Sequence, residues 1–158
     1  MLKLLKLIIL IATAKLSSKM KILILNGPNL NLIGRREPEI YGTKSFDEFI
    51  DEIRQKYSGV EIDYRQSNHE GILIDVIQES DGVYDGIVFN PGAYAHTSIA
   101  LADAIRSVKT PVVEVHLSNI YEREEFRRHS FTAEACVGSI VGRGMSGYED
   151  ALDTLLRM

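Results

Sequence analysis

The stretch KILILN, residues 21–26, is an uninterrupted apolar run that ends at an asparagine, and it predicts a buried β-strand. Four more short runs rich in Val and Ile have the same character: VEIDYR (60–65), YDGIVFN (84–90), PVVEVHL (111–117) and CVGSIVG (136–142). They are bounded by Gly, Pro or Asn, as strands commonly are. The sequence therefore predicts five strands.

Helical patterns alternate with these strands. They are SFDEFIDEIRQKY (45–57), EGILIDVIQES (70–80), HTSIALADAIRSV (96–108) and, after the last strand, YEDALDTLLR (148–157). The serine-to-glutamate spacing of Ser45 with Glu48, and of Ser146 with Glu149, predicts a capping box at the start of the first and last helices. Strand-helix alternation predicts an α/β domain: a flavodoxin-like, doubly wound five-stranded parallel sheet with helices on both faces.

Composition limits the classes of protein to which the chain can belong. A length of 158 residues with 45% hydrophobic and 25% charged content fits one globular domain. The single cysteine, Cys136, excludes an internal disulfide and is compatible with a reducing, cytoplasmic location. A net charge of -4 argues against a general nucleic-acid binder, because such proteins usually present a basic face.

Residues 1–19 differ from the rest because they contain four lysines and no acidic residue. Their apolar run, residues 7–12, is too short for a membrane span, which needs about 20 residues. Three interpretations stay open: a short secretory signal, translation from an upstream start codon with Met20 opening the domain, or an amphipathic appendage. We therefore treat residues 1–19 as an extension of uncertain role and residues 20–158 as one domain, and expect no membrane association.

Polar residues gather where the predicted strands end, which is where ligands bind in open parallel sheets. Glu114 and His116 lie two apart on the fourth strand, so both side chains face the same way and the carboxylate can hold one imidazole tautomer. Such a pair can also be a purely structural contact. Asn29 after the first strand and the segment 90–96 after the third favour a functional site, because core packing does not require polar groups at all of these ends.

Two loops carry further candidate groups. GPNLNLIGRREPEIYG (27–42) is far longer than an ordinary connection of about 4–6 residues, which favours a lid or binding segment. HLSNIYEREEFRRHS (116–130) carries Arg123, Arg127 and Arg128. These arginines could form a solvated turn with the neighbouring glutamates or, with Ser118, a site for a small anion. No glycine-rich nucleotide motif follows the first strand.

Taken together, the loop sequences resemble those of the type II 3-dehydroquinate dehydratases over essentially all of residues 20–158. The matching stretches are NGPNLNLIGRREPEIYG, RQSNHEG, FNPGAYAHTSIALADA, EVHLSNIYEREEFRRHS and VGRGMSGY. The resemblance implies dehydration of 3-dehydroquinate to 3-dehydroshikimate, a step of the shikimate pathway, through an enolate. It implies no metal, no cofactor and no Schiff base, and a homododecamer built as a tetramer of trimers.

The resemblance also implies roles for individual residues. Tyr41 would be the base, with Arg36 beside it. Asn29 would polarise the ketone through a water, and His116, held by Glu114, would be the acid assisted by Asn90. The remaining members of the implied site bind substrate: Ser118 and the amides of Leu117 and Ser118 the carboxylate, His96 and Arg127 the ring hydroxyls, and Asp103 from a neighbouring subunit.

A second class of function remains open from residue types alone. A non-catalytic flavodoxin-like module that binds a small polyhydroxy acid would carry the same polar groups at its strand ends. Turnover of 3-dehydroquinate distinguishes the two.

Overall fold

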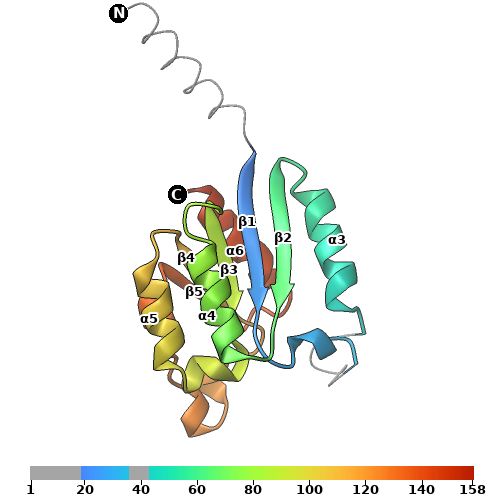
Figure 1. Cartoon of the computed structure of the whole chain (residues 1–158). Helices are drawn as coiled ribbons and strands as arrows, with labels where there is room; N and C mark the ends of the chain where they lie inside the picture. The colour runs from blue at the N-terminus through green and yellow to red at the C-terminus, as the bar shows by residue number, and fades with distance from the viewer. Residues whose placement is uncertain (1–18, 36–42) are drawn as a thin grey trace, which may run out of the picture.

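Five strands form one parallel sheet in the order β2-β1-β3-β4-β5 (Figure 1). The computed structural model describes residues 19–35 and 43–158. The strand order and the helices on both faces confirm the predicted flavodoxin-like α/β fold. The strands are β1 (Met20–Asn26), β2 (Val60–Gln66), β3 (Gly86–Asn90), β4 (Val112–His116) and β5 (Gly138–Val141), each within two residues of its predicted bounds.

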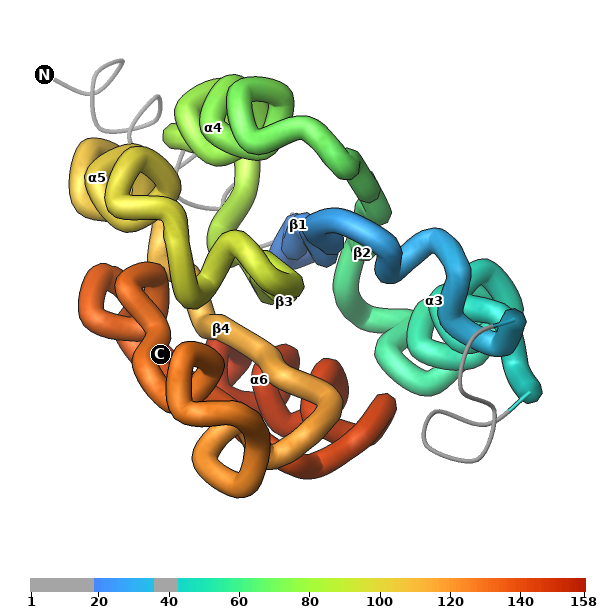
Figure 2. The backbone as a smooth tube through the Cα atoms, turned by 90° about the horizontal axis from the view of Figure 1, so that it is seen from below, coloured from blue at the N-terminus to red at the C-terminus, as the bar shows by residue number. Residues whose placement is uncertain are grey.

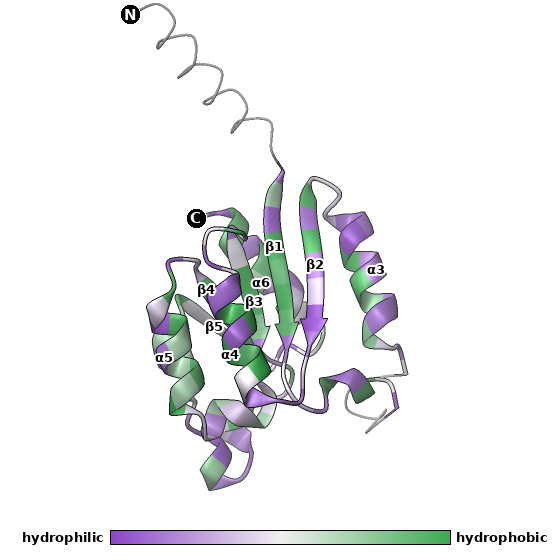
Figure 3. Ribbon diagram, viewed as in Figure 1, coloured by the Kyte–Doolittle hydropathy of each residue, from purple (hydrophilic) through white to green (hydrophobic). Residues whose placement is uncertain are grey.

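Helices cover both faces of the sheet, as the view in Figure 2 shows. α3 (Phe46–Lys56) and α6 (Ser146–Leu156) pack on one face, and α4 (Glu70–Glu79) and α5 (Ile99–Ser107) on the other. Alternate side chains of β1 enter the two cores: Ile22 and Ile24 on the α3 side, Leu23 and Leu25 on the α4 side. Burial on both faces explains why β1 is apolar from Ile22 to Leu25, the green part of this strand in Figure 3.

Short 3₁₀ helices occupy the connections that follow β1, β3 and β4 in the described part of the chain. They are η1 (Leu30–Leu32), η2 (Gly92–His96), η3 (Ile120–Glu122), η4 (Glu125–Arg127) and η5 (Ala133–Ala135). Over residues 19–35 and 43–158, no helix has both the length and the apolar character needed to cross a membrane.

The capping box predicted for the first helix is present at Ser45, but the one predicted at Ser146 is wrong. α6 begins at Ser146 itself, and the Ser146 hydroxyl donates to the carbonyl of Arg143 at 2.6 Å. The Glu149 carboxylate pairs instead with Lys56 of α3. Lys56, distant in the sequence, therefore binds the Glu149 carboxylate that the local pattern assigned to the helix cap.

The start predicted for the third helix is also wrong. α5 begins at Ile99 because Ser98 caps it, its hydroxyl accepting the Leu101 N–H at 2.9 Å. The preceding residues form the separate helix η2. His96 therefore lies in η2, at the carboxyl edge of the sheet, and not in the helix that covers its face.

A buried hydroxyl joins the ends of β1 and β3 to α6. Tyr148 is fully buried, donates to Asn26 Oδ1 at 2.7 Å and accepts from Asn90 Nδ2 at 3.0 Å. Asn26 and Asn90 face each other in the β1–β3 register. The Tyr148 ring packs edge-on against Phe46 and Phe49 of α3. Burial raises the pKa of the Tyr148 phenol above its ordinary value, so the hydroxyl stays neutral and keeps its proton for Asn26.

Removing this hydroxyl tests how much the junction contributes to stability. Tyr148→Phe leaves Asn26 Oδ1 and Asn90 Nδ2 buried without that partner, so the free energy of unfolding should fall by about 1–3 kcal/mol. Urea denaturation at one fixed protein concentration measures the change. Tyr121→Phe is the control: Tyr121 is 62% exposed, and its free energy of unfolding should change by no more than about 0.5 kcal/mol. Equal midpoints for the two variants would contradict the assignment.

Candidate active site

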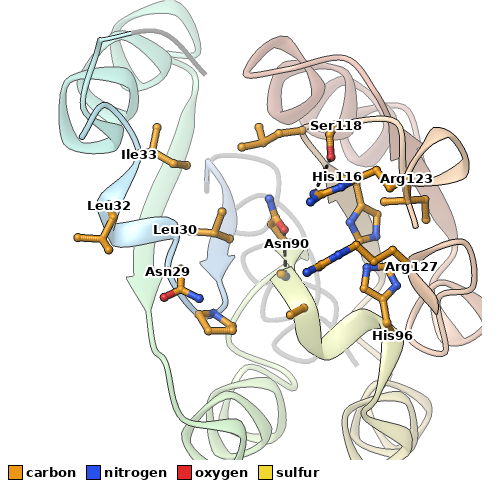
Figure 4. A pocket seen from close by; sticks show the side chains of 15 residues that line it. Asn29, Leu30, Leu32, Ile33, Asn90, His96, His116, Ser118, Arg123 and Arg127 are labelled. Atoms are coloured by element: carbon orange, nitrogen blue, oxygen red, sulfur yellow. Dashed lines mark hydrogen bonds between the residues drawn. The ribbon is translucent and has the colours of Figure 1, made fainter. Parts of the chain in front are cut away.

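A pocket of about 230 Å³ opens at the carboxyl edge of the sheet (Figure 4). Its two sides differ in character: Leu30, Leu32 and Ile33 form an apolar wall after β1, and basic and hydroxyl side chains face them from the β4 side. Such a pocket, mostly preformed with a few convergent polar groups, suits a small polar molecule with one apolar surface. The full lining is Pro28, Asn29, Leu30, Leu32, Ile33, Asn90, Gly92, Ala93, His96, His116, Leu117, Ser118, Ile120, Arg123 and Arg127.

Close contact between the loops after β1 and β3 fixes the floor of the pocket. The Gly27 N–H donates to the Asn90 carbonyl at 2.7 Å, and a Cβ on Gly27 would lie 2.4 Å from the Pro91 carbonyl oxygen. Only glycine fits there. Asn29 then turns the chain with φ 68°, a left-handed conformation that asparagine tolerates better than most residues, and its N–H donates to Asn68 Oδ1 at 3.0 Å. This turn directs η1 along the pocket.

Glu114 and His116 form the pair that the sequence predicts. Glu114 is fully buried in β4, and its Oε1 lies 2.5 Å from His116 Nε2. Because an ionised carboxylate only accepts hydrogen bonds, Nε2 carries a proton. No hydrogen bond to His116 Nδ1 comes from any residue in 19–35 or 43–158, and the ring lines the pocket. Nδ1 is therefore the nitrogen that can exchange a proton with a bound molecule.

The second histidine of the pocket is held in the opposite sense. His96 Nδ1 donates to the backbone carbonyl of His129 at 2.8 Å, so the neutral ring leaves Nε2 as an acceptor. Burial lowers the pKa of His96, and the nearby His116 and Arg127 lower it further, against the opposing effect of the His129 carbonyl. The rings of His96 and His116 stack with their centroids 6.0 Å apart. The pocket thus offers an imidazole acceptor beside a potential imidazolium donor.

Two arginines supply the positive charge on the β4 side. Arg123 Nη1 donates to the Ser118 hydroxyl at 3.4 Å, and Glu124 Oε2 lies 3.6 Å from Arg123 Nε and 3.3 Å from Arg127 Nε. A backbone hydrogen bond and both arginines hold the pKa of Glu124 below its ordinary value. Arg127 Nε is buried and has no aligned acceptor within the described part of the chain. The Arg127 side chain lines the pocket, where its other guanidinium N–H groups can donate to a bound molecule.

Most of the predicted site residues meet in this pocket. Asn29, Asn90, His96, His116, Leu117, Ser118 and Arg127 line it, and Glu114 lies directly behind His116. Asp103 does not: it is exposed on α5 and pairs with Arg106 at 3.2 Å. Arg36 and Tyr41 lie outside the described residues.

Sequence reasoning offered Arg123 as part of a possible anion site but assigned it no role in the implied active site, and it missed the apolar wall. Arg123 stood in a segment already singled out for its charge, but its direction depends on the two short turns η3 and η4. The wall comes from LNLI (30–33), which shows no strand or helix periodicity. In residues 19–35 and 43–158, no three His, Cys, Asp or Glu side chains are grouped as metal ligands would be.

Comparison with known proteins gives one consistent result. The model of the family described as dehydroquinase class II matches residues 20–156. A 3-dehydroquinate dehydratase of Idiomarina loihiensis is 54% identical over 145 residues, which cover 89% of this chain and 95% of that protein. One of Carboxydothermus hydrogenoformans is 55% identical over 139 residues, covering 87% and 90%. The crystal structure of a type II dehydroquinase from Butyrivibrio crossotus superimposes with a TM-score of 0.84 at 49% identity, covering 89% and 99%.

The environment of His96 predicts how this ring titrates. Its lowered pKa means that the folded chain binds fewer protons at this site than the unfolded chain near and below pH 6.5, so His96 should lower stability as the pH falls through that range. Histidine NMR should show one ring that remains neutral below pH 6.5 in the folded protein, with an ordinary midpoint in urea. His96→Gln should remove that signal and make the loss of stability between pH 7.5 and 5.5 shallower. If the assigned ring titrates at or above its midpoint in urea, burial does not control it.

Proposed function

The chain belongs to the class II dehydroquinase family and acts as a dehydratase of 3-dehydroquinate, and we propose that it removes water through an enolate, without metal, cofactor or imine. The observation that carries this proposal is the buried Glu114–His116 pair, whose free ring nitrogen faces a pocket lined by amides, hydroxyls and arginines. Because the curated relatives are enzymes, the alternative of a non-catalytic binding module is not retained.

The acid in this proposal is His116. When both ring nitrogens carry protons, the Glu114 carboxylate stabilises the charge through Nε2 and leaves the Nδ1 proton facing the pocket. Transfer of that proton to the C1 hydroxyl lets it leave as water, and the neutral ring keeps its hydrogen bond to Glu114. Asn90 lines the pocket close by, with its amide nitrogen already bonded to Tyr148. These contacts support an assisting role for Asn90 in holding the leaving hydroxyl.

The base is Tyr41, which would remove the proton from C2, the carbon beside the ketone, with Arg36 close to it. Both residues lie between the described ranges, and the proposal rests on their positions in the sequence. A tyrosine with an ordinary pKa of about 10 is only about 0.3% ionised at pH 7.5. A cation near 4 Å at an effective dielectric of about 20 is worth up to about 4 kcal/mol before desolvation, enough to raise that fraction greatly. This is the role we assign to Arg36.

The remaining groups bind and orient the substrate. Asn29, the residue just before η1, would stabilise the enolate oxygen through a water. Ser118 with the amides of Leu117 and Ser118 would take the carboxylate, and the Arg123 contact to the Ser118 hydroxyl adds a cation beside it. The acceptor nitrogen of His96 and the guanidinium of Arg127 suit ring hydroxyls, which both donate and accept.

The assembly and its location are part of the same proposal. We propose a homododecamer, a tetramer of trimers, in which Asp103 enters the pocket of a neighbouring subunit. Its exposed position on α5, outside the pocket of its own chain, supports this. Ile99 on the same helix is 60% exposed, as a side chain that packs against another subunit would be in an isolated chain. The free thiol of Cys136 supports a location in the reducing cytoplasm.

Variants of the proposed base and of the proposed acid should block different steps: removal of the C2 proton and departure of the C1 hydroxyl. The wild-type chain should convert 3-dehydroquinate to a conjugated enone that is visible in the ultraviolet. Tyr41→Phe should lower kcat by about 10²–10⁴-fold and abolish exchange of the C2 proton with solvent. His116→Ala should lower kcat by a similar factor but retain C2 exchange, because the enolate still forms and only the departure of the hydroxyl is blocked.

Binding of substrate, measured by calorimetry, is the control for both variants and should change little. More than about a tenth of the wild-type kcat in Tyr41→Phe would show that another group removes the proton. Loss of C2 exchange in His116→Ala would assign His116 to the first step instead of the second.

The reaction should form no covalent intermediate, because an imine requires an uncharged lysine amine in the pocket. None of the lysines in the described ranges lines it. Lys44 pairs with Glu52 at 2.7 Å, and acidic neighbours raise the pKa of Lys21 and of Lys56 above the ordinary value. Borohydride added during turnover should therefore leave the mass and activity of the enzyme unchanged. A stable adduct on any lysine, found by mass spectrometry, would overturn the enolate mechanism.

A further inference from the structure

The carboxylate of Glu114 has more partners than His116. Ser130 Oγ donates to Glu114 Oε1 at 2.7 Å, and Thr132 Oγ1 donates to Oε2. Ser130 is 8% exposed, and Thr132 is fully buried. Neither residue lines the pocket, and both lie 16 to 18 positions beyond Glu114 in the sequence. Two hydroxyls from a distant segment thus meet a buried charge that the reaction uses.

The direction of these hydrogen bonds is fixed by the surroundings. Ser130 Oγ accepts the Ala133 N–H at 3.1 Å, so its own proton is free for the carboxylate. Thr132 Oγ1 lies 3.2 Å from Ser130 Oγ. Every polar neighbour of the Glu114 carboxylate in the described ranges can therefore donate to it. An ionised Glu114 can accept from His116, Ser130 and Thr132 at the same time, so the arrangement suits a buried anion.

Few charged or titratable groups lie close enough to the Glu114 carboxylate to interact with its charge. His116 is its one ion-pair partner within residues 19–35 and 43–158. From the other elements packed around it, Cys136 and His96 are the titratable groups that sense the Glu114 charge. Burial and this charge raise the pKa of the Cys136 thiol, so the thiol stays neutral. The hydroxyls of Ser130 and Thr132 thus stabilise the buried anion, together with the Nε2–H of the neutral ring, when His116 has given up its Nδ1 proton.

We propose that Ser130 and Thr132 are positioning residues for the dehydration: they hold Glu114 ionised and aligned so that His116 keeps its second proton on the nitrogen that faces the substrate. The inference rests on the proposed acid role of His116. Ser130 and Thr132 touch neither substrate nor pocket and act only through Glu114. The carboxylate needs both hydroxyls because each of its oxygens is bonded by one of them.

The same segment also aligns the second histidine. The carbonyl of His129 fixes the tautomer of His96, and the Phe131 N–H donates to the Ala95 carbonyl at 2.8 Å. Residues 129–132 therefore bond to η2 on one side and to β4 on the other. The stacked arrangement of the two imidazole rings follows from these attachments.

The test uses variants that remove a hydroxyl and little else. Thr132→Val and Ser130→Ala should each lower kcat by about 10–100-fold, the effect of losing one hydrogen bond to a charged group, with KM changed by less than about twofold. Exchange of the C2 proton should persist, and the basic limb of the kcat–pH profile should move to higher pH, because a Glu114 carboxylate with fewer donors holds the imidazolium proton more strongly. Thr132→Ser, which keeps the hydroxyl, should retain most of the wild-type kcat.

A matched control separates positioning from stability. Thr110 is also buried, and its hydroxyl contacts the carbonyls of Ser80 and Tyr84. It lies just before β4, at the amino ends of the strands and away from the pocket. Thr110→Val should lower the unfolding midpoint without changing kcat or the pH profile. If Thr132→Val does not fold, Ser130→Ala and Thr132→Ser still decide the question.

A double-mutant cycle tests whether the effect passes through Glu114. In a Glu114→Gln background, Thr132→Val should cause no further loss of kcat, whereas independent effects would multiply. An unchanged kcat and pH profile in folded Thr132→Val and Ser130→Ala, with His116→Ala inactive, would overturn this proposal alone. A wild-type chain that fails to convert 3-dehydroquinate would overturn the proposed function instead.

Discussion

A parallel sheet covered on both faces leaves the polar side chains at the ends of its central strands largely shielded from water, and this constraint determines which groups they bond to. Asn26 and Asn90 end neighbouring strands and are both buried, so each must find partners inside the protein. Tyr148 supplies them from α6. Glu114 meets the same requirement one strand further along, through His116, Ser130 and Thr132. Asn26 Oδ1, Asn90 Nδ2 and both oxygens of Glu114 are thus each bonded to a group distant in the sequence.

Sequence reasoning could reach the fold and the location of the site because both depend on local patterns. Apolar runs predict the strands, and parallel topology brings the polar residues after them to one edge. The prediction of Glu114 and His116 as a pair follows from the two-residue period of a strand. The hydrogen-bond and ion-pair partners of individual side chains could not be predicted where local and distant partners were both possible. Ser146 and Glu149 match the same local pattern as Ser45 and Glu48, yet their partners are Arg143 and Lys56.

The groups that sequence reasoning missed have one property in common: their role is set by tertiary contacts alone. Tyr148, Ser130 and Thr132 lie in segments with no unusual composition, and nothing in their spacing relates them to a carboxylate or an asparagine elsewhere. Arg123 stood in a segment of mixed charge, and its direction depends on two short turns. The electrostatics of the site are equally local. The chain carries a net charge of -4, but the pocket presents Arg123, Arg127 and a histidine pair to an anionic substrate.

The position of Tyr148 in the last helix has a consequence for how the chain folds during synthesis. All five strands are made before the hydroxyl that joins β1 to β3 through α6. Until that helix docks, the face of the sheet that carries Asn26 and Asn90 is not covered by α6, and the apolar core on that side lacks Ala151, Leu152 and Leu155. The chain can therefore reach its final structure only after α6 has been made. The step that completes the fold is then also the one that fixes the Asn90 side chain at the pocket.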